Sequence, residues 1–178
     1  MKEQIVKYFP FILEMEDPSL KEAVVGTYED ALVKGGWRPE DMESIPATLL
    51  IPNCPFNFHQ HTSAVTACAI AVARSMMEVY GNAFSVDMDV IIAGGLLHDV
   101  GKLLEIERDP GGGWRKSAQG KILRHPLSGM NLAAARGISD PILHIIACHS
   151  KEGNAVRRTT EAIIIHHADF SNFEPFKP

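Results

Sequence analysis

The sequence has few cysteines and no long apolar run. Its three cysteines, Cys54, Cys68 and Cys148, are an odd number, and two lie in apolar helical patterns. This argues against a disulfide framework and indicates reduced core thiols of a cytosolic protein. No segment reaches the roughly 20 apolar residues of a membrane span, and the first residues lack the apolar core and cleavage site of a signal peptide. We therefore expect a cytoplasmic protein without a membrane partner.

An excess of positive charge is also missing. The chain has 17 Lys and Arg against 22 Asp and Glu in 178 residues, a formal net charge of −5. A surface that binds long nucleic acid needs many clustered cations, so we do not expect that partner. A small anionic ligand held by a few local cations stays open. The length is sufficient for one domain that buries a sizeable core without structural staples.

Apolar residues recur with a helical period wherever the period is clear, which predicts an all-α fold. The first of these helices begins with an Asp17 cap and Pro18, and it ends at Gly35. The helix expected over about 61–80 has small and aliphatic residues on most of its faces and should therefore be central. Helices are expected over about 17–35, 61–80, 85–99, 126–137, 139–150 and 159–172.

Proline and glycine indicate the irregular segments. Residues 37–58 contain four prolines and should form an irregular connector, and 109–120, "DPGGGWRKSAQG", should be a flexible loop or a short hairpin. We divide the chain into an N-terminal helical extension with the Pro-rich connector, 1–55, and a main domain, 56–178, which together form one compact unit. Residues 1–55 carry no assignable motif. They could supply a lid, core cover or a dimer surface, so a homodimer stays open.

Histidine and aspartate recur at the expected helix ends. Alone, a histidine usually packs or hydrogen-bonds in the core. Together, imidazoles and carboxylates from five helices suit a catalytic metal site with positions left open for water. His59 and His61 cannot share a helix face, His166 could be an orienting partner or a ligand, and His144 is assigned to core or surface. The candidate ligands are His61, His98, Asp99, His125, His149 and Asp169.

The stretch "GGLLHDVGKLLE", 94–105, places a cation close behind the His98–Asp99 pair. A helix C-terminus favours His through its dipole, which gives the pair a purely structural explanation. That explanation does not account for Lys102. An ammonium three residues past Asp99, after the turn-permitting Gly101, can pair with the carboxylate or reach an anion held on a metal.

The motifs "HTSAV", "LLHDVGK", "HPLSG", "CHSKEG" and "HHADF" resemble, in this order, the H…HD…H…H…D signature of the HD superfamily of metal-dependent phosphohydrolases, from about residue 61 to 169. The resemblance implies a helical bundle around a dinuclear site for two divalent ions, whether Fe, Mn, Zn, Ni, Co or Mg. It implies that Asp99 bridges them. One ion would be held by His61, His98, Asp99 and Asp169, and the other by Asp99, His125 and His149.

Two ions that share a carboxylate can bind a phosphoryl oxygen and lower the pKa of a bridging water. We therefore expect hydrolysis of a phosphomonoester or phosphodiester by a metal-activated hydroxide, with Asp99 and Lys102 as the catalytic residues. A set of loop cations could bind a small phosphorylated or nucleotide substrate, although a solvated loop face explains them equally well. These cations are Arg115, Lys116, Lys121, Arg124 and Lys151.

Several segments, among them "AQGKILRHPLSG" and "TTEAIIIHHAD", are also similar to the HD module of certain 3′→5′ exoribonucleases. Because this chain is acidic and has no obvious β module before the HD region, a small nucleotide fits better than a polymer. Two alternatives stay open. One is an HD-fold di-iron oxygenase that cleaves a C–C or C–P bond, since the ligand set does not separate iron from manganese or zinc. The other is a non-catalytic nucleotide-sensing HD module.

Overall fold

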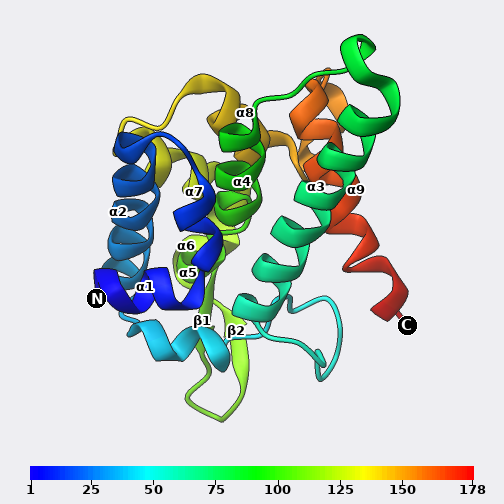
Figure 1. Ribbon diagram of the computed structural model, residues 1–178. Helices are drawn as coiled ribbons and strands as arrows, with labels where there is room; N and C mark the ends of the chain where they lie inside the picture. The colour runs from blue at the N-terminus through cyan, green and yellow to red at the C-terminus, as the bar shows by residue number, and fades with distance from the viewer.

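The computed structural model describes residues 1–178 and is predominantly helical, which confirms the all-α class (Figure 1). The only sheet is a two-stranded antiparallel hairpin of β1 (Ile106–Arg108) and β2 (Trp114–Lys116). Short 3-10 helices lie at Pro10–Glu14, Pro39–Glu43, Gly81–Ala83, Lys151–Ala155 and Glu174–Phe176. The α-helices are α1 (Lys2–Tyr8), α2 (Pro18–Gly35), α3 (Phe58–Tyr80), α4 (Met88–Leu97), α5 (Lys102–Glu105), α6 (Ala118–Ile122), α7 (His125–Ala134), α8 (Asp140–Cys148) and α9 (Thr160–Ser171).

Capping side chains set the ends of the longer helices. The Asp17 carboxylate accepts a hydrogen bond from the Ser19 amide at the start of α2. Asn57 and Gln60 form a reciprocal capping box, so α3 begins at Phe58, three residues before the expected start. The loop expected over 109–120 is a hairpin turn, the strand β2 and the short helix α6.

Helix α4 is the central element of the core. Every residue from Val90 to Leu97 is buried, because α4 packs against α3, α8 and α9. Ile5, Phe9 and Tyr28 of the N-terminal segment belong to the same hydrophobic cluster as α4, and the Tyr28 hydroxyl donates to the Leu96 carbonyl at 2.5 Å. The C-terminal end of α4 therefore delivers the residues that follow it into the protein interior.

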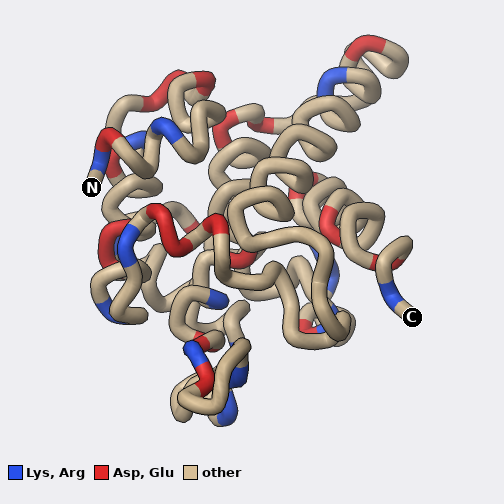
Figure 2. Tube along the Cα trace, turned by 90° about the horizontal axis from the view of Figure 1, so that it is seen from below, with Lys and Arg blue, Asp and Glu red and all other residues tan.

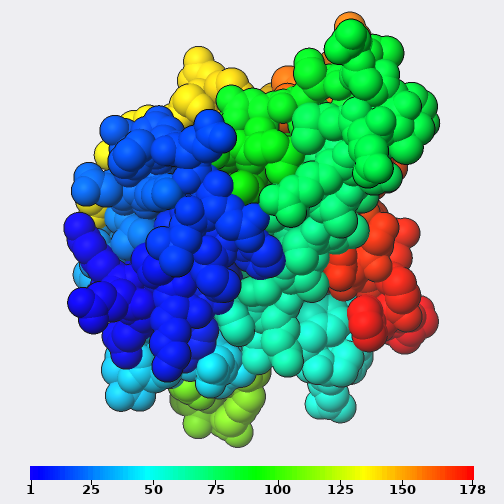
Figure 3. All heavy atoms as spheres, in the orientation of Figure 1, coloured from blue at the N-terminus to red at the C-terminus, as the bar shows by residue number.

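The surface shows how the chain ends cover this core. The N-terminal segment covers one side, and the C-terminal segment lies against the beginning of α3 (Figure 3). Acidic and basic residues are interspersed along the trace, without a face that is basic throughout (Figure 2). No helix combines the length and the apolar character needed to cross a membrane.

Candidate metal centre and active site

The ligand-type residues singled out in the sequence come together from five helices. They lie in the first turns of α3, just after α4, at the start of α7, just after α8 and in the last turns of α9. Asp169 is partly exposed and the others are buried. The set consists of His61, His98, Asp99, His125, His149 and Asp169.

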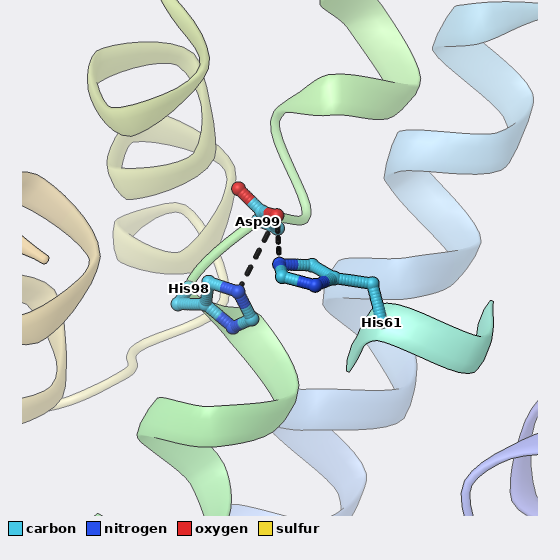
Figure 4. Close-up of side chains that lie close together, drawn as sticks. All are labelled: His61, His98 and Asp99. Carbon is cyan, nitrogen blue, oxygen red and sulfur yellow. Dashed lines mark ion pairs between the residues drawn. The ribbon is translucent and has the colours of Figure 1, made fainter. Parts of the chain in front are cut away.

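The carboxylate of Asp99 lies at the centre of this cluster. Its Oδ2 is 3.3 Å from Nε2 of His61 and 3.3 Å from Nε2 of His98, the two contacts drawn in Figure 4. Its Oδ1 is 3.3 Å from Nε2 of His125 and 3.6 Å from Nε2 of His149. The two carboxylate oxygens therefore face two different pairs of imidazoles. These are two groups of three candidate ligands that have Asp99 in common.

Asp169 adds a second carboxylate to the group that contains His61. Its Oδ1 lies 3.1 Å from Nε2 of His61, on the side of that ring that also faces Asp99. Burial would raise the pKa of Asp169, but the hydrogen bond with His61 and the nearby imidazoles lower it to about 2. Asp169 is therefore an anion at neutral pH, as a metal ligand must be.

The donor set fits divalent ions. Ligand atoms about 2.1 Å from a tetrahedral ion lie about 3.4 Å from one another, and the separations here are 3.1 to 3.6 Å. The buried Nε2 of His98, the ring nitrogen that faces Asp99, makes no hydrogen bond. A buried imidazole nitrogen without a partner is costly unless something else binds it. Imidazole and carboxylate ligands suit zinc, iron, manganese and related ions.

Backbone carbonyls orient several of the rings. Nδ1 of His98 is 2.6 Å from the Gly95 carbonyl oxygen, and Nδ1 of His149 is 2.9 Å from that of Ile146. Because Nδ1 donates the proton in each case, Nε2 keeps its lone pair for the cluster. His166 contacts the carbonyl oxygen of His149 through Nδ1 at 2.5 Å, so it lies behind a ligand-type residue as the sequence indicated.

Glu105 is the functional residue that the sequence reasoning missed. Its Oε2 accepts hydrogen bonds from the backbone N–H of His125 at 2.7 Å and from Nδ1 of the same residue at 2.8 Å. Its Oε1 pairs with Arg124 at 3.0 Å and Lys116 at 3.5 Å. Burial would raise the pKa of Glu105, but the hydrogen bonds from His125 and the charge of Arg124 lower it to about 2. The available signal was one acidic residue that ends an apolar helical turn.

Lys102 faces both the cluster and the Pro-rich connector. Its Nζ lies 2.5 Å from Oδ2 of Asp99 and donates to the carbonyl of Ala47 at 2.6 Å. Burial would raise the pKa of Asp99, but the charge of Lys102 and the surrounding imidazoles hold that pKa well below its ordinary value. Asp99 is therefore ionised, and the ammonium of Lys102 is fixed at the edge of the cluster.

A cavity of about 340 Å³ opens above the cluster. Of the five loop cations named above, Lys116, Arg124 and Lys151 line it. Arg115 and Lys121 do not line it and lie on the exposed surface. Because successive side chains of a strand point to opposite faces, Lys116 turns toward the cavity and Arg115 turns away to pair with acidic residues of the hairpin.

His59 and His144 also lie outside the cluster. Nε2 of His59 contacts the carbonyl oxygen of Tyr8 at 2.9 Å. Nε2 of His144 lies 3.4 Å from Sγ of Cys148. Both therefore have structural contacts, which for His144 agrees with its assignment to core or surface.

Comparison with known proteins assigns the family. A family model described as the HD domain matches residues 58–170, a range that contains all six ligand-type residues. The chain belongs to the HD domain family. It is 33% identical over 115 residues to dihydroneopterin 2′,3′-cyclic phosphate phosphodiesterase of Methanocaldococcus jannaschii. The match covers 62% of this chain and 43% of the relative, so the HD chain described here spans less than half of the relative's length. No solved structure matches it.

Proposed function

We propose that this HD protein is a metal-dependent phosphohydrolase that acts on a small nucleotide-like phosphoester. The observation that carries the proposal is the buried Asp99, whose two oxygens face separate imidazole pairs beneath a cavity that several cations line. The name of the relative supports cleavage of a phosphodiester bond, and in particular of the phosphodiester bond in a cyclic phosphate. The cavity volume suits one small molecule rather than a polymer.

The proposed cofactor is a pair of divalent ions that share Asp99. When bound, such ions supply a water of lowered pKa and neutralise charge on the phosphoryl oxygens. The first ion has four candidate ligands, and the second has three. They are His61, His98, Asp99 and Asp169 for the first, and Asp99, His125 and His149 for the second.

The protein's own cations would bind and orient the phosphate. Lys102 is held by Asp99 and Ala47 on the cavity wall, where its third N–H can donate to a phosphoryl oxygen. Lys151 lines the same cavity without an ion pair, so it is available to an incoming anion. An ammonium that meets charge developing in the transition state lowers the barrier more than it strengthens ground-state binding.

The N-terminal segment is part of the proposed enzyme unit, because the connector places Ala47 against Lys102 and contributes four consecutive residues, 47–50, to the cavity wall. We include a cytoplasmic location in the proposal, and the three free cysteines support it. We also propose a homodimer, which a measurement of the molecular mass in solution tests.

The test is a panel of phosphomonoesters, 2′,3′-cyclic nucleotides and linear phosphodiesters, with oxygen uptake followed in parallel. Protein loaded separately with iron, manganese or zinc should release product without consuming oxygen. Asp99→Asn should abolish turnover and lower metal content, whereas Arg115→Ala, outside the cavity, serves as the control and should change neither. Oxygen uptake by the iron form with no phosphoester cleaved would favour the oxygenase, and nucleotide binding without turnover would favour the sensing module.

A further inference from the structure

One wall of the cavity is charged. Glu105 joins Lys116 and Arg124 through ion pairs, and Nε of Arg124 lies 3.2 Å from Glu152. All four of these residues line the cavity. The same Glu105 contacts His125, so this charged wall borders the second group of candidate ligands.

Another wall of the cavity is aromatic and consists of Phe56, Phe170 and Phe173, which all line it. Nζ of Lys177 lies 4.6 Å from the ring centroid of Phe173 and 5.8 Å from that of Phe170, so these two rings are neighbours. Phe56 contacts the same C-terminal turn through Phe176, with ring centroids 4.9 Å apart. In Figure 3 this segment lies against the start of α3. We call Phe56, Phe170 and Phe173 the aromatic wall.

The aromatic wall borders the first group of candidate ligands. The ring of Phe56 stacks on that of His61, with centroids 5.8 Å apart and planes 23° apart, and Phe170 directly follows Asp169. The candidate metal cluster therefore separates an aromatic wall from a charged wall. A substrate whose phosphoryl group lies over the cluster has its remaining part directed toward one of these walls, and the aromatic wall offers the ring faces on which a planar ring can stack.

The face of Phe173 is accessible to such a ring. Lys177 covers it with an ammonium group, and the Lys177 side chain is 43% exposed. An exposed cation–π contact is weak and easily replaced. A planar ring entering the cavity can therefore stack on Phe173 where the ammonium lies.

The cavity has few neutral polar side chains that could read the edge of a base, because most of its polar lining residues are charged or belong to the candidate metal cluster. No asparagine or glutamine lines it, and its two hydroxyl side chains already have partners. Thr48 accepts from the Leu50 amide at 3.0 Å, and Ser150 donates to Glu152 at 2.5 Å. Amide side chains are the usual readers of adenine, whereas stacking tolerates every base.

Building on the proposed function, we infer that the aromatic wall binds a planar heteroaromatic ring of the substrate by stacking. The substrate class is then a ring-bearing phosphoester such as a nucleoside or pterin cyclic phosphate. Selection is for the presence of the ring and only weakly for its identity.

The experiment compares the four nucleoside 2′,3′-cyclic phosphates with glycerol 1,2-cyclic phosphate, which has the same reactive ring and no base. We expect the Phe173→Ala variant to lower kcat/KM for the nucleotides about tenfold more than for the glycerol compound. The loss should fall mainly on KM, because stacking holds substrate and transition state alike. Phe173→Trp should restore the preference. Tyr80→Ala, an exposed aromatic residue at the far end of α3, is the matched control.

A second readout does not depend on turnover. Calorimetric titration of the metal-loaded protein with inorganic phosphate and with a nucleoside 2′-monophosphate should show tighter binding of the nucleotide, and Phe173→Ala should remove most of that difference. If Phe173→Ala lowered kcat/KM and binding affinity equally for ring-bearing and ring-free ligands, the inference would be overturned while phosphoester hydrolysis stayed intact. Values of kcat/KM that differ by more than about 100-fold among the four nucleotides would also overturn it, because such discrimination requires hydrogen bonds to the edge of the base. If no phosphoester is cleaved, the proposed function fails, and the binding comparison still decides whether the aromatic wall holds a ring.

Discussion

Replacing Glu105 with glutamine should weaken the binding of one metal ion and leave the binding of the other unchanged. Glu105 fixes His125 through both the backbone N–H and Nδ1 of that histidine. Glutamine has the same size and can keep its amide oxygen toward His125. Its NH₂ group then faces Arg124 and Lys116, which now approach a donor instead of an anion. The imidazole loses a negatively charged acceptor, and with it both basicity and a fixed orientation.

The expected size of the effect follows from these contacts. Removing a partner that orients a metal-bound histidine typically lowers metal affinity about 10- to 100-fold. Because glutamine keeps a neutral hydrogen bond, Glu105→Gln should lie near the lower limit. Glu105→Ala leaves the buried N–H groups of His125 without an acceptor and should lie near the upper limit. His61 and His98 make no contact with Glu105, so the affinity of the first ion should stay unchanged.

Competition with a chelator, followed by elemental analysis, measures the two affinities separately. Glu107→Gln is the matched control, since Glu107 lies two residues further on, is more exposed and pairs with Arg115 outside the cavity. Thermal melting of the metal-free proteins checks that each variant folds. An equal weakening of both ions, or no weakening of either, would refute the assignment of Glu105 to the second group alone.

Three further predictions concern the same site. Lys102→Met should reduce turnover on the order of 100-fold while metal content measured by elemental analysis stays near wild type, because the ammonium acts on the phosphoryl charge; a parallel loss of metal would make Lys102 structural. His149→Ala should lower the metal content from two ions toward one, and loss of both ions would show that the ligands are divided differently. In the metal-free protein, the contribution of Glu105 to the free energy of unfolding should be fully present above pH 4.5, its ordinary pKa, and disappear as the pH falls through its folded pKa of about 2. Acid titrations should therefore show a shallower loss of stability for Glu105→Gln between these values, and parallel curves would contradict the depressed pKa.

Much of the cluster could be predicted from the sequence because each candidate ligand is tied to a local signal. His98 and Asp99 follow an apolar helix, and His149 follows another. Helix ends point into a shared interior when the helices are buried along their length, as α4 is. Sequence order and the HD resemblance then connected residues that lie far apart in the chain. The fold class followed from the same periodicity.

Residues that act through distant contacts were not predictable in this way. Glu105 orients His125 only because α5 packs against α7, and Ala47 holds Lys102 by a backbone carbonyl that no side-chain pattern encodes. The loop cations were grouped together because the strand alternation was not recognised. Once the pairing of β1 with β2 is fixed, Arg115 and Lys116 point in opposite directions.

The turn after α4 gives a physical reason for the order of residues in "HDVGK". A side chain at position 101 would place its Cβ 2.1 Å from the carbonyl oxygen of His125 and 2.6 Å from the amide nitrogen of Gly129, both backbone atoms of α7. Only glycine allows α7 to approach this closely, and the approach brings His125 within 3.3 Å of Asp99. Lys102 follows at once and reaches back to the same carboxylate. His98 belongs to the first group and Asp99 to both, whereas Gly101 makes room for the helix that completes the second, so one short turn couples both halves of the candidate centre.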